Sequence, residues 1–177
     1  MVPDEHKLEE LIVLLAQSFE DDEAAGATKL NKVLFYIDFV HHRRFGRPVT
    51  GMEYQKLEHG PAPRRLLPVR DRLIQSGALQ QVETEFHGLP QRRLKALRQP
   101  NLDGFGPTET DVIDEVVDAF RGRNGKELSD LSHQTFGWQW VAIGDTIPYF
   151  TAFARQDQTL SESMRERAER LTRGLSA

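Results

Sequence analysis

Two stretches of the chain repeat their apolar residues at three- and four-residue spacing, which is the period of an amphipathic helix. They cover residues 5–19 and 28–45. In the second stretch Phe35 and Phe39 add another apolar face to the stripe that begins at Leu30. A helix that is apolar on two faces is typical of the centre of a core. We therefore expect the helix over 28–45 to be buried at the centre of the fold.

Further elements follow from the same patterns. Helical spacing recurs over residues 65–76, 108–121, 126–133 and 160–175. Runs that favour strands cover residues 53–57, 79–86 and 92–97. The last two strands flank the hairpin signal His87-Gly88-Leu89-Pro90, whereas residues 60–63 are expected to end regular structure. The aromatic segment 136–153 is interrupted by Gly and Pro and is expected to be irregular.

Residues with special backbone preferences mark the ends of these helices. Asp4 and Thr28 are expected to cap the first two helices, and Gly46 and Gly77 to close the second and third in the left-handed conformation. Pro68 must lie in the first turn of its helix, where a missing N–H is tolerated.

The order helix, helix, strand, helix, hairpin, helix predicts an α+β fold that is predominantly helical. A central buried helix would pack against a small β-hairpin or sheet. A helix followed by a hairpin is also the order found in winged-helix domains. The length of 177 residues suits a single domain, which we expect to span residues 1–177.

The composition narrows the cellular context. Cysteine is absent, which excludes disulfides, thiol catalysis and thiolate metal sites and fits a reducing compartment. The first ten residues are acidic and do not resemble a signal peptide. The longest apolar stretch, residues 11–16, is too short to span a bilayer. We expect a cytoplasmic protein with no membrane partner.

Charge is distributed unevenly along the chain. Residues 43–98 hold 12 Lys and Arg against 5 Asp and Glu, whereas the remainder holds 23 − 12 = 11 basic and 27 − 5 = 22 acidic residues. A basic middle with acidic ends can meet a charged partner, or it can bring parts of the same chain together. The sequence leaves both interpretations open.

Motifs for chemistry are incomplete. Residues 122–127 (GRNGKE) lack the spacing and the Ser or Thr of a phosphate-binding loop. His41 and His42 are adjacent on a helix and point about 100° apart, so they cannot chelate one metal together. Ser132 and His133 have no nucleophile elbow around them. We therefore predict that the chain is not an enzyme and uses no cofactor or metal.

Three charged residues lie in the central helix before its last turn. Asp38 stands among apolar neighbours and needs a hydrogen bond or an ion pair if it is buried. Lys29 and Lys32 share one face, three residues apart. They either pair with acids from the first helix or contact a partner.

Four spaced elements carry a family resemblance. They are the helix start with Lys29, Leu30, Lys32, Phe35 and Asp38, the turn Gly46-Arg47-Pro48, the turn ending in Gly60-Pro61, and the element Leu128-Ser-Asp-Leu-Ser-His133 followed by Trp138. In this order they resemble the Panacea-domain (SocA-like) antitoxins. The resemblance covers a core of about 27–138 and leaves 139–177 as a C-terminal aromatic segment and helix. Asn31, His59 and Gly137 depart from the residues usual in the family.

The resemblance implies an antitoxin that neutralises a cognate protein toxin by direct protein–protein contact. One relative delivers its toxin to a cellular protease, so the resemblance also implies an adaptor role as an option. Arginines and aromatic residues are favoured interface anchors. The candidate contact residues are Arg43, Arg44, Arg47, Arg64, Arg65 and Trp138, with Trp140, Tyr149 and Phe150 beside them in the sequence. The tryptophans can equally well fill the core.

The alternative function is a nucleic-acid-binding regulator that acts on its own promoter DNA. The predicted strand Arg92-Arg93-Leu94-Lys95-Ala96-Leu97-Arg98 resembles a basic wing, and phosphate affinity follows from such charge. The net charge of −4 and the lack of an evident recognition helix weigh against this alternative.

Overall fold

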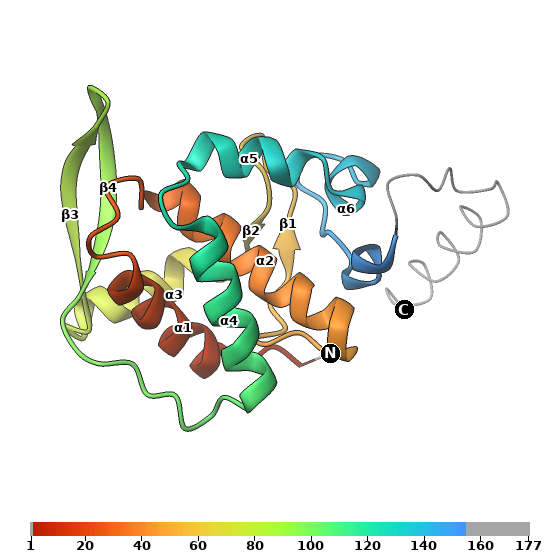
Figure 1. Ribbon diagram of the computed structural model, residues 1–177, viewed down its shortest axis with the longest axis horizontal. Helices are drawn as coiled ribbons and strands as arrows, with labels where there is room; N and C mark the ends of the chain where they lie inside the picture. Colours follow the sequence, from red (N-terminus) through yellow and green to blue (C-terminus); the bar gives the residue numbers. More distant parts are fainter. Residues whose placement is uncertain (1, 155–177) are drawn as a thin grey trace, which may run out of the picture.

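The computed structural model shown in Figure 1 describes residues 2–154. Its elements follow in the order α1 (Glu5–Ser18), α2 (Ala27–Phe45), β1 (Tyr54–Gln55), β2 (Ala62–Pro63), α3 (Leu66–Gln75), β3 (Leu79–Phe86), β4 (Leu89–Ala96), α4 (Pro107–Phe120), α5 (Gly125–His133), α6 (Phe136–Trp140) and the 3-10 helix η1 (Tyr149–Phe153). The predicted α+β, predominantly helical fold is confirmed. The expected helix over 160–175 lies outside the described residues.

Helix α2 runs through the middle of the molecule, with α1, α4 and α5 around it (Figure 1). It packs against α4, α5, β2 and η1. Val33, Leu34 and Ile37 are fully buried on it, because apolar side chains on both faces remove it from water. The central buried helix is therefore confirmed.

The helix ends show which capping predictions hold. Asp4 caps α1 by accepting a hydrogen bond from the Lys7 backbone N–H (2.9 Å), and Gly46 ends α2 with a φ of 74°. The prediction for Thr28 is wrong, because Gly26 is the N-cap and the helix already begins at Ala27. Gly77 follows α3 with a φ of 74°, as expected.

Helix α4 begins one residue before the predicted Thr108, at Pro107. The Glu109 carboxylate accepts from the Gly106 N–H (2.9 Å), which satisfies a backbone donor at the helix start. The same carboxylate pairs with the Lys7 ammonium at 2.7 Å. Glu109 is buried, so this ion pair fastens α4 to the first turn of α1.

Two small antiparallel sheets complete the fold. Strand β1 pairs with β2 through Tyr54↔Pro63 and Gln55↔Ala62. The expectation that residues 60–63 lack regular structure is therefore wrong for Ala62 and Pro63, because pairing with β1 holds them as a strand. Strands β3 and β4 form the predicted hairpin, with Leu79↔Ala96 at one end.

The hairpin turn is tighter than the sequence indicated. His87 and Gly88 have φ angles of 51° and 78°, as required in a two-residue turn with the twist of the adjoining strands. Strand β4 therefore begins at Leu89, three residues earlier than expected. The hairpin packs on α1 and α3, while its tip extends beyond the helices (Figure 1).

The aromatic segment 136–153 is more regular than expected, because it contains α6 and η1. These two short helices pack on each other, and η1 also packs on α2. No helix within residues 2–154 has the length and apolar character needed to cross a membrane.

Candidate partner-binding site

Asp38 of α2 is fully buried and joins three segments. Its carboxylate accepts hydrogen bonds from the Thr50 backbone N–H (2.6 Å) and the Thr50 hydroxyl. It also accepts from the hydroxyls of Tyr54 (2.8 Å) and Tyr149 (3.3 Å). The buried Asp38 therefore has the hydrogen-bond partners that we expected it to need. Burial raises the pKa of the Asp38 carboxyl, and these hydrogen bonds act in the opposite direction.

Lys29 makes an internal ion pair. Its buried ammonium lies 2.7 Å from the Asp22 carboxylate and donates to the Arg123 carbonyl at 2.9 Å. Asp22 also accepts from the Gly122 backbone N–H at 2.8 Å. The acid that Lys29 meets comes from the loop after α1, so this lysine fastens that loop and the α4–α5 turn to α2.

Lys32 holds a turn of the chain. We call residues 57–61, between β1 and β2, the Gly60 turn. The buried Lys32 ammonium donates to the Pro61 carbonyl (3.2 Å), and no ion pair with a carboxylate is seen for it within residues 2–154. Burial lowers the pKa of Lys32 to about 8, because the charged form loses water. Gly60 has a φ of +95°, and a Cβ there would overlap the Ser132 hydroxyl and lie 2.5 Å from Lys32 Cε.

Helices α5 and α6 hold the other side of the Gly60 turn. The Ser129 hydroxyl donates to the His59 carbonyl (2.8 Å), and the Trp138 indole N–H donates to the Leu57 carbonyl (3.2 Å). The His133 ring stacks on Trp138 with 4.0 Å between ring centroids. The residues of the family resemblance that surround the turn therefore bind one another. Trp138 is partly buried and makes a hydrogen bond within the fold, so at least part of its surface serves the scaffold.

Replacing Lys32 by methionine is expected to change how stability depends on pH. The pKa of Lys32 is about 8 in the folded chain, below its ordinary value of 10.5, so the unfolded chain binds more protons between these pH values. The free energy of unfolding should therefore rise by about 3 kcal/mol between pH 8 and 10.5, and this contribution is absent below pH 8. Urea unfolding across this range should show the rise in the parent chain and not in Lys32→Met.

Lys95 provides the control for this experiment, because its side chain is exposed. Lys95→Met should keep the rise between pH 8 and 10.5. At pH 7, Lys32→Met no longer buries a charge without a counter-ion but leaves the Pro61 carbonyl without its donor, so the two effects should largely cancel. An unchanged pH slope in Lys32→Met would show that the lysine is solvated in the folded chain.

The predicted contact arginines come from two places in the fold. Arg43 and Arg47 are exposed at the end of α2 and form no ion pair within residues 2–154, whereas Arg44 there binds the Glu115 carboxylate of α4 at 2.7 Å. Arg64 and Arg65 lie at the junction of β2 and α3. Arg64 donates to the Gly144 carbonyl (2.7 Å), and Arg65 binds Glu5 (2.6 Å).

Ion pairs join the basic middle of the chain to its acidic flanks. They link Arg44 to Glu115, Arg65 and Arg72 to Glu5, Arg72 to Glu9, Lys95 to Glu20, and Arg98 to Glu10. Attraction between parts of the same chain therefore accounts for a substantial part of the uneven charge distribution.

The cations of the predicted basic wing are also engaged. Arg92 pairs with Glu83 across the hairpin (3.2 Å), and Arg93 donates to the Phe19 and Glu20 carbonyls. Lys95 and Arg98 pair with acids of the first 20 residues. Each of these four cations therefore has a partner within residues 2–154, although the exposed Arg92–Glu83 pair is a weak one.

The neighbouring His41 and His42 make different contacts. His41 contacts the Arg47 carbonyl through Nδ1 (2.6 Å), and the ring of His42 lies against Tyr149 with 5.3 Å between centroids. In the described part of the chain, no three His, Asp or Glu side chains are grouped as metal ligands.

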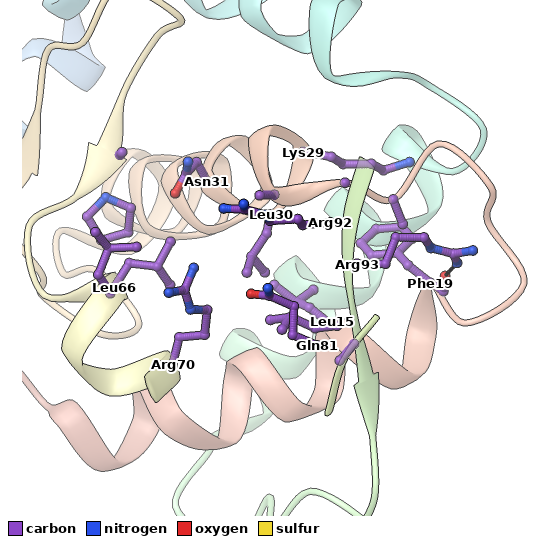
Figure 2. Close-up of a pocket in the computed structure, with 18 of the residues that line it drawn as sticks. Leu15, Phe19, Lys29, Leu30, Asn31, Leu66, Arg70, Gln81, Arg92 and Arg93 are labelled. Atoms are coloured by element: carbon purple, nitrogen blue, oxygen red, sulfur yellow. Dashed lines mark hydrogen bonds between the residues drawn. The ribbon is translucent and has the colours of Figure 1, made fainter. Parts of the chain in front are cut away.

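An apolar pocket that sequence reasoning missed lies between α1, the first half of α2, the β2–α3 junction and the hairpin (Figure 2). Its volume is about 210 Å³. Buried Leu15, Phe19 and Leu66 line it, and Leu67 at its mouth is 59% exposed. The only signal in the sequence is Leu67 itself, an apolar residue that falls outside the buried stripe of α3.

Within residues 2–154, the charged side chains that line this pocket all have the same sign. Its cationic lining residues are Lys29, Arg64, Arg70, Arg92 and Arg93, and among the described residues no Asp or Glu lines it. Figure 2 shows Arg70 beside Leu66 on one side and Arg93 beside Phe19 on the other. Asn31 also lines the pocket, and its buried side-chain oxygen has no hydrogen-bond donor within residues 2–154. The lining of the pocket therefore combines apolar side chains with positively charged ones.

Comparison with known proteins identifies the family. Residues 30–139 match the family described as "Antitoxin SocA-like, Panacea domain". This match covers more than half of the chain, so the chain belongs to the SocA-like Panacea-domain antitoxin family, and the resemblance seen in the sequence is confirmed. No curated protein and no solved structure matches the chain significantly.

Proposed function

We propose that this chain is an antitoxin that neutralises a cognate protein toxin by direct contact and without catalysis. Membership of the antitoxin family carries the proposal. The geometry supports it, because Lys32, Gly60 and His133 of the family resemblance hold the scaffold together from inside. A scaffold held in this way leaves its outer surface available for a partner.

A single domain fits this role. The buried apolar residues of α1, α2, α3, α4 and α5 form one cluster. We propose that the whole chain, residues 1–177, acts as one unit in which a partner contacts a surface made by several elements. The exposed Arg43 and Arg47 remain candidate contacts, together with the apolar pocket.

Co-expression tests this function. The full chain should restore growth to cells that express the toxin encoded beside its own gene, and the two proteins should co-purify. Growth should depend on the chain in proportion to its expression. If the chain is expressed and folded by circular dichroism, yet the toxin still stops growth and no complex is isolated, the proposed function is wrong.

Delivery of the bound toxin to a cellular protease would extend this proposal. The two modes differ in what happens to the toxin. Direct neutralisation alone leaves the toxin protein at constant level in the complex, whereas an adaptor shortens its lifetime. Immunoblotting of the toxin after translation arrest, with and without the chain, separates the two modes, and we expect a constant level.

A further inference from the structure

We propose that the apolar pocket binds an acidic amphipathic segment of the partner toxin. An apolar side chain of that segment enters between α1, α2 and α3, and carboxylates on its flanking residues meet Arg70 and Arg92. This inference rests on the proposed antitoxin function and adds the chemistry of the partner and the place where it binds.

The size of the pocket favours a side chain over a cofactor. Pockets for small-molecule ligands typically measure about 300–1,000 Å³, whereas this one measures about 210 Å³. One large apolar side chain, or two small ones, would fill it. The half-exposed Leu67 and Leu57 at its mouth would be covered at the same time, and such coverage is favourable because it removes apolar surface from water.

The cations that line the pocket favour a partner segment with negative charge. Within residues 2–154 Arg70 pairs with its neighbour Asp71 (2.7 Å), and Arg92 pairs with Glu83, where both side chains are more than 60% exposed. The exposed Arg92–Glu83 pair is weak. A carboxylate of the partner can therefore replace the present acid at little cost. Arg93 donates to two backbone carbonyls and forms no ion pair with a carboxylate of the described residues.

Asn31 supplies a further point of recognition. Its buried side-chain oxygen lacks a donor within residues 2–154, which is costly in a folded protein. A backbone N–H of the entering segment would satisfy it. A segment whose backbone reaches this oxygen would therefore bind more favourably than a free apolar molecule.

The tail of the same chain is a poor occupant. Residues 155–177 contain five arginines and four acidic residues, so they do not complement the cationic lining. A second copy of the chain is a separate outcome that sedimentation detects.

Fluorescence anisotropy with labelled peptides and the full chain tests the inference. The probes are Asp-Glu-Leu-Phe-Asp-Glu, its basic counterpart Lys-Arg-Leu-Phe-Lys-Arg, and the polar counterpart Asp-Glu-Ser-Gly-Asp-Glu. Only the first should bind saturably. Leu67→Glu should weaken this binding at least tenfold, because it places a carboxylate at the mouth. Ile143→Glu is the matched control at 62% exposure and should leave binding unchanged.

The arginines are tested separately. The double variant Arg70→Ala, Arg92→Ala should weaken binding of the acidic peptide and flatten its dependence on salt, whereas Lys126→Ala, which removes an 84% exposed cation of α5, should change neither. Absence of saturable binding, equal binding of the three peptides, or binding unaffected by Leu67→Glu overturns the inference. A dimer in sedimentation that Leu67→Glu dissociates also overturns it, since a second copy would then occupy the pocket.

The same variants separate this inference from the proposed function. If Leu67→Glu still restores growth and binds the toxin as tightly as the parent chain, the antitoxin function stands and the pocket assignment fails. If the acidic peptide binds and responds to Leu67→Glu, but no toxin is neutralised, the pocket assignment stands and the antitoxin function fails.

Discussion

Asp38→Ala is expected to lower the free energy of unfolding by about 3–5 kcal/mol, because it leaves donors from Thr50, Tyr54 and Tyr149 without their buried acceptor. Each unsatisfied buried group costs roughly 1–3 kcal/mol. Tyr54 can still donate to the Leu34 carbonyl and Tyr149 to the Met52 carbonyl, so the costs do not simply add. Urea unfolding at pH 7 measures the loss.

Asp38→Asn is the matched control. The amide keeps the shape of the side chain and an acceptor for the Thr50 backbone N–H, while its NH₂ group can donate to the nearby hydroxyl oxygens. We expect a loss below about 1 kcal/mol. If alanine and asparagine are equally mild, Asp38 does not join the segments as described.

The parent chain and Asp38→Asn should also differ in how the free energy of unfolding depends on pH. Because the pKa of Asp38 is raised in the folded chain, the folded state keeps a proton that the unfolded state releases above its ordinary value of 3.8. The contribution of Asp38 to stability is therefore greatest at low pH and falls as pH rises through this value towards the folded pKa. Asp38→Asn should lack this fall, so the stability difference between parent and variant should shift in favour of the variant as pH rises.

Gly60→Ala is expected to destabilise the chain by about 2–6 kcal/mol, the sum of backbone strain and overpacking. A side chain at a φ of +95° is strained, at a cost of roughly 1–3 kcal/mol. The added Cβ would also collide with Ser132 and with Lys32 Cε, and overpacking of this kind costs about 1–3 kcal/mol more. Thermal or urea unfolding should show the combined loss.

Gly88→Ala separates the two costs. Gly88 also has a positive φ, of 78°, but no atom lies within 4 Å of the position that a Cβ would take there. Gly88→Ala should lower the free energy of unfolding only by the strain contribution, about 1–2 kcal/mol. If Gly60→Ala is no worse than Gly88→Ala, the Gly60 turn is not tightly held by α2 and α5.

The parts of the fold that depend on local patterns could be predicted from the sequence. Helix α2 follows from apolar residues on two faces, and its end follows from Gly46. The need of Asp38 for partners also followed, because a buried acid among apolar residues is costly without them. The identity of those partners did not follow, since Tyr149 is 111 residues away along the chain.

Features made by distant segments could not be predicted. Strand β2 contains only Ala62 and Pro63, which β1 fixes in place, so no local pattern indicates it. The role of Lys32 depends on where the Gly60 turn folds back on α2. The apolar pocket combines separate regions of the chain, and only Leu67 departs from the expected pattern in any one of them.

Hydrogen exchange of the full chain, alone and with its toxin, tests the central claim most directly. The claim is that the family residues hold the scaffold while a partner binds at the apolar pocket. The toxin should slow exchange of amides in 62–67, from β2 into the start of α3, and in 91–94, within β4, more than elsewhere. Slowed exchange confined to other surfaces, with both pocket segments unchanged, would contradict it.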